Sequence, residues 1–266
     1  MTAMNLLLSD SAALIGRHLR HTKRVPQKLI SATIMPVAMV VIFGYLFGSS
    51  MQVPGGDYKE YIMPGIFTMV MLAGISTTAV GVATDLHNGL VDRFRSLPIS
   101  HVSVLIGRTV SDLVTTVISC MVMTAVGYLI GWRISGGVLA VLGGFLLIFL
   151  LGLAMAWLGA WIGLAMRNAE AVNAIGSFVT MPLAFLSAAF FPLSNLPGWL
   201  RTVAEWNPVS AVTTAAREMW GNPTGIGADA GLPVRNPVLF SLLGLAVLFA
   251  IAVPKAVRAF QRAAAR

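Results

Sequence analysis

Uncharged apolar stretches alternate with short polar segments along nearly the whole chain. Six of these stretches contain a run close to the roughly 20 residues with which an α-helix crosses about 30 Å of hydrocarbon. The six predicted spans are about Leu29–Ser50, Tyr61–Ala83, Val104–Gly131, Gly136–Met166, Ala171–Phe191 and Asn236–Val253. The pattern therefore predicts an all-α, polytopic membrane protein in which residues 1–266 form a single domain with six transmembrane helices.

The segment ahead of the first span, residues 1–27, has the pattern of an amphipathic helix that lies in the membrane surface. Leu8, Ile15 and Leu19 can share one helical face, whereas the basic side chains of the segment point mostly elsewhere. His18 and His21 lie within this basic cluster. We expect them on a solvated basic face rather than as metal ligands.

A short polar segment, residues 84–103, separates the second span from the third. At helical spacing Leu86, Leu90 and Phe94 fall on one face, and the charged side chains fall largely away from it. The helix is expected to end before Pro98, because the residue preceding a proline is disfavoured in the α region. The segment is too short and too charged to cross a bilayer. It is predicted to be a helix on the membrane surface with a face free for a partner, or alternatively a solvated loop whose leucines rest on lipid headgroups.

Residues 192–235, ahead of the last span, are too interrupted to cross the membrane and too apolar for a free loop. We predict two short helices that re-enter the outer leaflet and are broken at Asn207–Pro208. Trp199, Trp206 and Trp220 have the spacing expected of aromatic anchors at the headgroup boundary.

Arg108 and Asp112 lie four residues apart near the start of the third span and can pair on one helical face. A carboxylate within a membrane is a functional candidate. Here a structural ion pair is favoured, because both residues lie within a turn or two of the interface.

The fourth span is rich in glycine, with Gly143, Gly144, Gly152, Gly159 and Gly163. Small residues let helix backbones approach closely in a membrane. We therefore expect this span to pack inside the bundle.

Composition agrees with the membrane assignment. The 266 residues are 57% hydrophobic and 11% charged, and the mean hydropathy is +0.82, whereas soluble domains carry about 25% charged residues. Cys120 is the only cysteine, which excludes an intramolecular disulfide and a cysteine-based metal site.

Six spans would place the loops and termini alternately on the two sides of the membrane, and positive charge is distributed unevenly between these sides. Thirteen of the 18 Lys and Arg residues fall on the side that carries both termini, whereas the ten acidic residues divide equally. The positive-inside rule then places both termini in the cytoplasm. Anionic lipid accounts for the surplus positive charge, so we expect membrane lipids and no nucleic acid among the partners.

Several catalytic and binding motifs are absent from the sequence. None of the four lysines, Lys23, Lys28, Lys59 and Lys255, follows a glycine, so the chain has no phosphate-binding loop. No His-Glu-x-x-His or Gly-x-Ser-x-Gly motif occurs, and no carboxylate lies at the middle of a span. We expect no catalytic residue, no metal site and no cofactor bound by this chain.

Two stretches resemble ABC-2 type transporter permeases, particularly the bacterial daunorubicin-resistance branch of multidrug and natural-product exporters. Asp85–Ser100, with Gly89, Asp92-Arg93 and Leu97-Pro98-Ile99-Ser100, is similar to the cytoplasmic coupling helix of that family. Phe191-Pro192, Leu196-Pro197-Gly198-Trp199 and Asn207-Pro208 are similar to its segment before the last helix. The resemblance covers nearly the whole chain, although His87 stands where the family more often has an acidic residue or arginine.

The resemblance implies the permease subunit of an ATP-binding-cassette exporter in the bacterial plasma membrane. Two such subunits, identical or paralogous, would assemble with two separate ATPase subunits that bind ATP and Mg²⁺. The residues implied to contact the ATPase are Asn88, Gly89, Leu90, Asp92, Arg93, Phe94, Arg95, Leu97 and Pro98. Closure of the ATPases would push this helix and switch the cavity between the subunits from inward- to outward-facing.

By the same resemblance, the substrate path lies between the first, second and fifth spans. Its expected residues are Met35, Met39, Phe43, Phe67, Met69, Met71, Phe178, Met181 and Phe185. Polarisable methionines and aromatic faces suit a hydrophobic or amphiphilic compound, although the same residues also suit packing or contact with lipid. The alternatives are a lipid, glycan or peptide exporter of the same class, an ATP-independent channel or secondary carrier, and, less favoured, a membrane-embedded enzyme.

Overall fold

The computed structural model describes residues 26–48, 53–88, 101–166, 168–227 and 230–264. Within these ranges the chain is helical, and the only extended pairing there is an antiparallel bridge between Val53 and Gly56. The helices are α2 (Pro26–Ile42, continued by a π-helical turn over Phe43–Phe47), α3 (Tyr58–Leu72), α4 (Gly74–His87), α6 (His101–Leu129), α7 (Val138–Met166), α8 (Ala169–Phe185), a 3-10 turn (Leu193–Asn195), α9 (Gly198–Glu205), α10 (Pro208–Trp220), α11 (Leu232–Arg235) and α12 (Pro237–Ala264). The all-α prediction is confirmed for this part of the chain. The surface helix predicted over residues 1–27 lies outside it, except for the first residues of α2.

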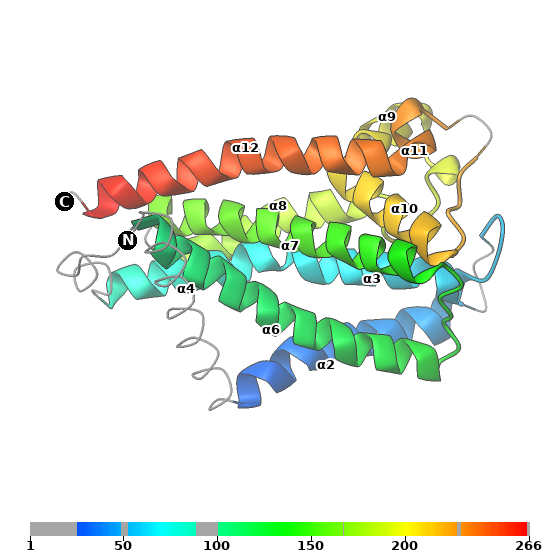
Figure 1. The fold of residues 1–266 in the computed structure, drawn as a ribbon, viewed down its shortest axis with the longest axis horizontal. Coiled ribbons are helices and arrows are strands. Elements are labelled where there is room, and N and C mark those ends of the chain that lie inside the picture. The colour runs from blue at the N-terminus through cyan, green and yellow to red at the C-terminus, as the bar shows by residue number, and fades with distance from the viewer. Residues whose placement is uncertain (1–25, 49–52, 89–100, 167, 228–229, 265–266) are drawn as a thin grey trace.

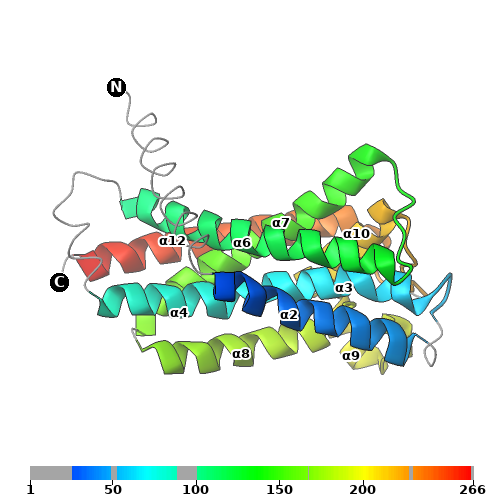
Figure 2. The same cartoon turned by 90° about the horizontal axis from the view of Figure 1, so that it is seen from below.

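Six apolar helical segments lie side by side and run alternately in opposite directions (Figures 1 and 2). Four are long and apolar enough to cross a membrane, and they are Tyr58–His87 (α3 and α4 together), Ser103–Leu129, Val138–Met166 and Pro237–Ala263. The other two, Thr33–Phe47 and Ala169–Phe185, are shorter. Helix α12 extends past the predicted end at Val253, so Lys255, Arg258 and Arg262 belong to the helix.

Helix α7 lies at the centre of the bundle, in contact with α3, α4, α6, α8, α10 and α12. It is apolar on every side, as is typical of a buried helix. Its glycines permit the closest approach to α4. A Cβ at Gly159 would overlap the carbonyl of Ile75, and one at Gly163 would overlap the carbonyl of Ala79. The prediction that this glycine-rich span packs inside the bundle is confirmed.

The segment between α8 and α12 contains the short helices α9, α10 and α11, which gather at one end of the bundle (Figure 1). Helices α9 and α10 meet at Asn207–Pro208, as predicted. The Asn207 Oδ1 accepts a hydrogen bond from the Val209 N–H (2.9 Å), which caps the start of α10. Pro208 fits the first position of the helix, where a backbone N–H would have no intrahelical partner.

The fifth span is shorter than predicted, because α8 ends at Phe185 and the chain turns before Phe191. The Asn207 side chain explains where it ends. Its Nδ2 donates to the carbonyls of Leu183 and Leu186, at 2.9 and 2.7 Å. These carbonyls at the end of α8 are therefore satisfied by a residue that lies more than twenty positions away.

Trp220 is a core residue and not the membrane anchor that its spacing predicted. Its ring is fully buried against Phe67 and Phe145. Its Nε1 donates to the carbonyl of Val141 (3.1 Å), so its polar atom is satisfied inside the protein. The rings of Trp199 and Trp206 are exposed.

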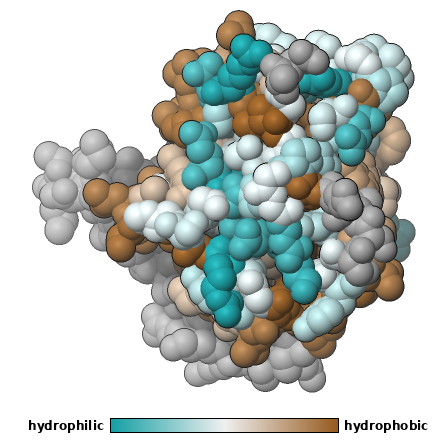
Figure 3. Space-filling model, turned by 90° about the vertical axis from the view of Figure 1, so that its right-hand side faces the viewer, coloured by the Kyte–Doolittle hydropathy of each residue, from teal (hydrophilic) through white to brown (hydrophobic). Residues whose placement is uncertain are grey.

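The end of the bundle that carries α9, α10 and α11 presents many hydrophilic side chains. Figure 3 views this end and shows a band of hydrophilic residues across its middle, with hydrophobic residues mainly toward the edges. The C-terminal ends of α4 and α12 and the start of α6 lie at the opposite end (Figure 1). Long apolar helices between polar ends are the arrangement expected of a protein that crosses a bilayer.

Replacement of Gly159 by alanine is expected to destabilise the bundle, because the added Cβ would force α7 away from the Ile75 carbonyl. Overpacking of this kind costs about 1–3 kcal/mol, which should lower the midpoint of thermal unfolding of the purified protein in detergent. Gly137→Ala is the matched control, because no atom lies within 4 Å of a Cβ built there. Equal midpoints for the two variants would contradict the close contact between α7 and α4.

Candidate functional site

The residues predicted to contact an ATPase begin where α4 ends. Asn88 is the C-cap of α4, and its N–H donates to the carbonyl of Thr84 (3.0 Å). The other predicted contact residues lie outside the described part of the chain, and they are Gly89, Leu90, Asp92, Arg93, Phe94, Arg95, Leu97 and Pro98. The structure describes the two flanking helices, α4 and α6. The contacts between these helices fix the two helix ends from which the segment extends.

A cluster of charged side chains joins α4 to α6 close to this segment. Nη1 of Arg108 lies 2.8 Å from Oδ2 of Asp85 on α4, and its Nε lies 3.1 Å from Oδ2 of Asp112 on α6. Thr78 of α4 donates a hydrogen bond to the same Asp112 oxygen (2.9 Å). The predicted pair of Arg108 and Asp112 is therefore present, and the structure adds two partners from α4.

Gly81 leaves the space that the arginine occupies. Thr78, Gly81 and Asp85 lie three and four residues apart, on one face of α4. A Cβ at Gly81 would overlap the Arg108 guanidinium, so the arginine lies directly over this glycine. Two carboxylates share a single guanidinium. Charge-assisted hydrogen bonds are stronger than neutral ones, and partial burial protects them from screening by salt.

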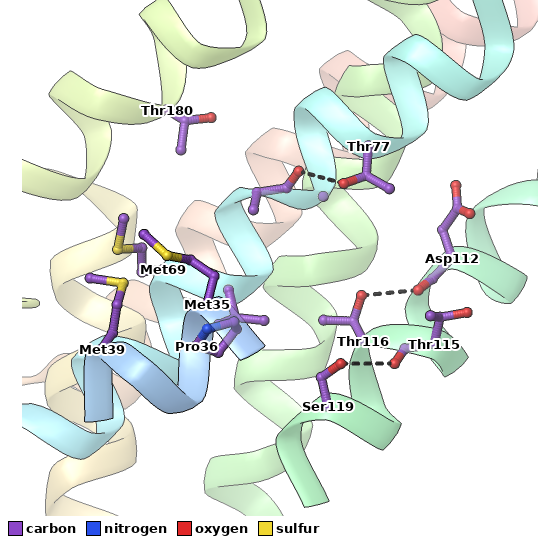
Figure 4. A pocket seen from close by; sticks show the side chains of 13 residues that line it. Met35, Pro36, Met39, Met69, Thr77, Asp112, Thr115, Thr116, Ser119 and Thr180 are labelled. Carbon is purple, nitrogen blue, oxygen red and sulfur yellow. Dashed lines mark hydrogen bonds between the residues drawn. The ribbon is translucent and has the colours of Figure 1, made fainter. Parts of the chain in front are cut away.

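An open cavity of about 300 Å³ adjoins this cluster, between α2, α3, α4, α6 and α8 (Figure 4). One wall consists of methionines, Met35 and Met39 of α2 and Met69 of α3. The facing wall, from α6, consists of the hydroxyl side chains Thr115, Thr116 and Ser119. These hydroxyls lie within hydrogen-bond distance of carbonyls one turn earlier in their own helix. Ser119 also bonds the Thr33 hydroxyl of α2 (3.2 Å), whereas the oxygens of Thr115 and Thr116 can still accept hydrogen bonds. A polarisable apolar wall opposite a wall of hydroxyl oxygens suits an amphiphilic ligand.

Two further polar residues contribute to the cavity. Asp112 lines it and also bonds Arg108, so it belongs both to the cavity wall and to the charged cluster. Thr180 contributes from α8 (Figure 4). Its Oγ1 is buried and has no hydrogen-bond partner among the described residues.

The residues predicted for the substrate path fall into separate environments. The three methionines Met35, Met39 and Met69 come together in the cavity, while Phe178, Met181 and Phe185 lie exposed on α8. Phe43 is partly buried against the core. Phe67 and Met71 are enclosed in the core of the single chain, where the Phe67 ring contacts Trp132, Phe145 and Trp220.

Neither the hydroxyl wall of α6 nor the role of Asp85 was predicted from the sequence. Thr115, Thr116 and Ser119 follow Asp112 at helical spacing in an otherwise apolar span, and this repeat was the available signal. Asp85 gave no comparable signal, because its partner Arg108 lies 23 positions away. Within the described residues, no three His, Cys, Asp or Glu side chains are grouped so as to hold a metal ion.

A second buried cation lies nearer the opposite end of the bundle. Arg217 of α10 is fully buried, and its guanidinium donates to the carbonyls of Tyr61, Ala188 and Ala189 at 2.8, 2.7 and 3.0 Å. The guanidinium also lies 3.6 Å from the centre of the Tyr61 ring. Burial lowers the pKa of Arg217, but arginine starts from so high a pKa that it stays charged. The arrangement ties α10 to the start of α3 and to the turn after α8.

The apolar helices and their polar ends define the chain as a multi-pass membrane protein. The model of the ABC-2 type transporter family matches residues 11–219. The chain is 31% identical over 228 residues to the daunorubicin resistance ABC transporter permease protein DrrB1 of Streptomyces coeruleorubidus, covering 86% of this chain and 78% of that protein. It is 26% identical over 258 residues to the probable doxorubicin resistance ABC transporter permease protein DrrC of Mycobacterium tuberculosis, covering 96% and 90%. The chain therefore belongs to the ABC-2 type transporter family, as its sequence resemblance predicted.

A more distant relative is the probable multidrug ABC transporter permease YbhR of Escherichia coli. It is 24% identical over 215 residues, which cover 80% of this chain and 56% of that protein. Each of these three relatives is named as a permease of an ABC transporter.

Arg217→Lys is expected to destabilise the protein although the positive charge is kept, because an ammonium cannot reach all three carbonyls that the planar guanidinium binds. Loss of these hydrogen bonds should cost about 2 kcal/mol or more. The measurement is thermal unfolding in detergent followed by tryptophan fluorescence. Arg262→Lys, at an exposed position of α12, is the control and should leave the midpoint unchanged. A midpoint for Arg217→Lys equal to that of the control would disprove the anchoring role.

Proposed function

We propose that the chain is the permease subunit of an ATP-binding-cassette exporter that moves a hydrophobic or amphiphilic compound, such as a drug, an antibiotic or a lipid-like molecule, out of the cell. The observation that carries this proposal is the family match over residues 11–219, together with relatives that are named as drug-resistance permeases. The two walls of the cavity, methionine and hydroxyl, support an amphiphilic cargo.

In this proposal all six apolar helices cross a bacterial inner membrane, including the two shorter ones. Helix α8 has 17 residues, at the lower end of the range for a spanning helix. The alternating directions of the six helices (Figure 2) support an even number of crossings, with both termini on one side. Lys255, Arg258 and Arg262 lie in the C-terminal part of α12, so the positive-inside rule makes that side cytoplasmic. Helices α9 and α10 then lie at the outer leaflet as the re-entrant region of residues 192–235.

The energy for transport comes from a separate ATPase subunit, present in two copies and carrying the ATP and Mg²⁺. The absence of a phosphate-binding loop from this sequence supports the placement of ATP hydrolysis on another subunit. A second copy of the permease, or a paralogue, completes the membrane part of the complex.

The segment from Asn88 to Pro98 is the proposed contact with the ATPase. Leu90 and Phe94 supply the apolar contact, and Asp92, Arg93 and Arg95 set its orientation. The cluster around Arg108 supports this role, because it joins the two helices that flank the segment. A push on the segment would therefore act on both α4 and α6, and both helices line the cavity.

Two alternatives make different experimental predictions. A lipid or glycan exporter of the same class would also require the ATPase but would respond to a different cargo. An ATP-independent channel or secondary carrier would transport when purified without any ATPase. The deciding experiment is co-purification of the chain with an ATPase encoded beside it, followed by measurement of ATP hydrolysis in the presence of candidate compounds.

Phe94→Asp is expected to leave the permease inserted in the membrane but to reduce ATPase stimulation and export by about tenfold or more, because a carboxylate would enter an apolar contact. ATP hydrolysis and export of a fluorescent compound would be measured on the same preparations. Phe94→Leu is the matched control, since it keeps an apolar side chain and should retain most of both activities. Native stimulation and export by the Phe94→Asp complex would remove the segment from the proposed role.

A further inference from the structure

Asp112 and Asp85 lie at the two ends of the charged cluster and serve different parts of the molecule. Asp112 lines the cavity, whereas Asp85 lies in the last turn of α4, three residues before Asn88. Arg108 bonds both carboxylates, and it uses a different nitrogen for each. One guanidinium therefore connects the cavity wall to the last turn of α4, which precedes the segment that is proposed to contact the ATPase.

The two ion pairs of Arg108 differ in how readily they can open. Arg108 and Asp112 lie four residues apart on α6, so their bond persists when α6 moves as a unit. The bond from Arg108 to Asp85 crosses between helices and depends on how α4 and α6 are shifted against each other. The Asp85 side chain is 32% exposed, against 13% for Asp112, so water can solvate it when the bond opens. Of the two ion pairs, the one between Arg108 and Asp85 can thus be broken and remade by a shift of α6 against α4, and the hydrogen bond from Thr78 to Asp112 crosses the same interface.

We propose that this cluster couples occupancy of the cavity to the position of the C-terminal end of α4 relative to α6, with Asp85 and Arg108 as positioning residues; the inference rests on the exporter function proposed above. A ligand that contacts the hydroxyl wall and Asp112 displaces α6 relative to α4 and opens the bond between Arg108 and Asp85. Coupling between two sites is reciprocal, so displacement of the end of α4 by the ATPase changes the cavity in turn. The cluster thereby has two states, with the bond between Arg108 and Asp85 either formed or open. A ligand in the cavity and the ATPase each shift the balance between these two states.

The test is a double-mutant cycle on the complex of permease and ATPase in lipid nanodiscs, measured as the rate of ATP hydrolysis. Thr115→Trp fills the cavity and takes the place of a ligand, because Thr115 lines the cavity and is only partly buried. Asp85→Asn removes the ion pair while keeping the size of the side chain. We expect Thr115→Trp alone to change the hydrolysis rate about fivefold, and the change to disappear in the Asp85→Asn background. Arg108→Lys, which cannot reach both carboxylates, should act like Asp85→Asn, and Asp85→Glu should restore part of the coupling.

Glu205→Gln is the control, because it removes an ion pair away from the cluster, between Arg201 and Glu205 at 2.8 Å on α9. It should leave the response to Thr115→Trp intact. If the Arg108 cluster were only structural, Asp85→Asn would lower stability and also leave that response intact. An additive cycle, or no response to Thr115→Trp in the native background, would overturn this proposal alone. A chain that neither co-purifies with an ATPase nor stimulates one would overturn the proposed function, and this proposal with it.

Discussion

The close packing of α7 on α3 and α4 is the constraint around which the other helices are arranged. Gly159 and Gly163 bring the α7 backbone against the carbonyls of Ile75 and Ala79. Inside a bilayer an apolar side chain gains little by exchanging lipid for protein, so close van der Waals packing has to hold the helices together. Helices α6, α10 and α12 also pack on α7, whereas α8 packs mainly on α4 and α2 packs mainly on α6.

Two arginines in this apolar bundle are satisfied in different ways. Arg217 donates to three backbone carbonyls, so displacement of its side chain breaks three hydrogen bonds inside the protein at once. Arg108 instead pairs with two carboxylates, one of which is partly exposed and can exchange its ion pair for water. The first arrangement suits a fixed joint between helices. The second suits a contact that changes during a cycle of movement.

The cavity and the proposed ATPase contact share the same two helices. Helices α4 and α6 both contribute to the cavity wall, and the chain between their ends forms the segment with the proposed coupling residues. In the proposed function, this arrangement would relate cargo and energy source through a short, partly polar contact. The methionine wall opposite the hydroxyl wall gives the cavity two chemistries, which is why an amphiphile fits the proposal better than a purely apolar compound.

Features that depend on neighbours along one helix could be predicted from the sequence. The apolar intervals located the helices, Asn207–Pro208 located the break before α10, and the spacing of Arg108 and Asp112 predicted their ion pair. Contacts that cross between helices could not be predicted, because they depend on how the helices are rotated and shifted against one another. That packing brought Asp85 to Arg108 and placed the hydroxyls of α6 opposite the methionines of α2. It also buried Phe67 and Trp220, which an apolar pattern cannot distinguish from lipid-facing residues, since the protein core and the surrounding lipid are equally apolar.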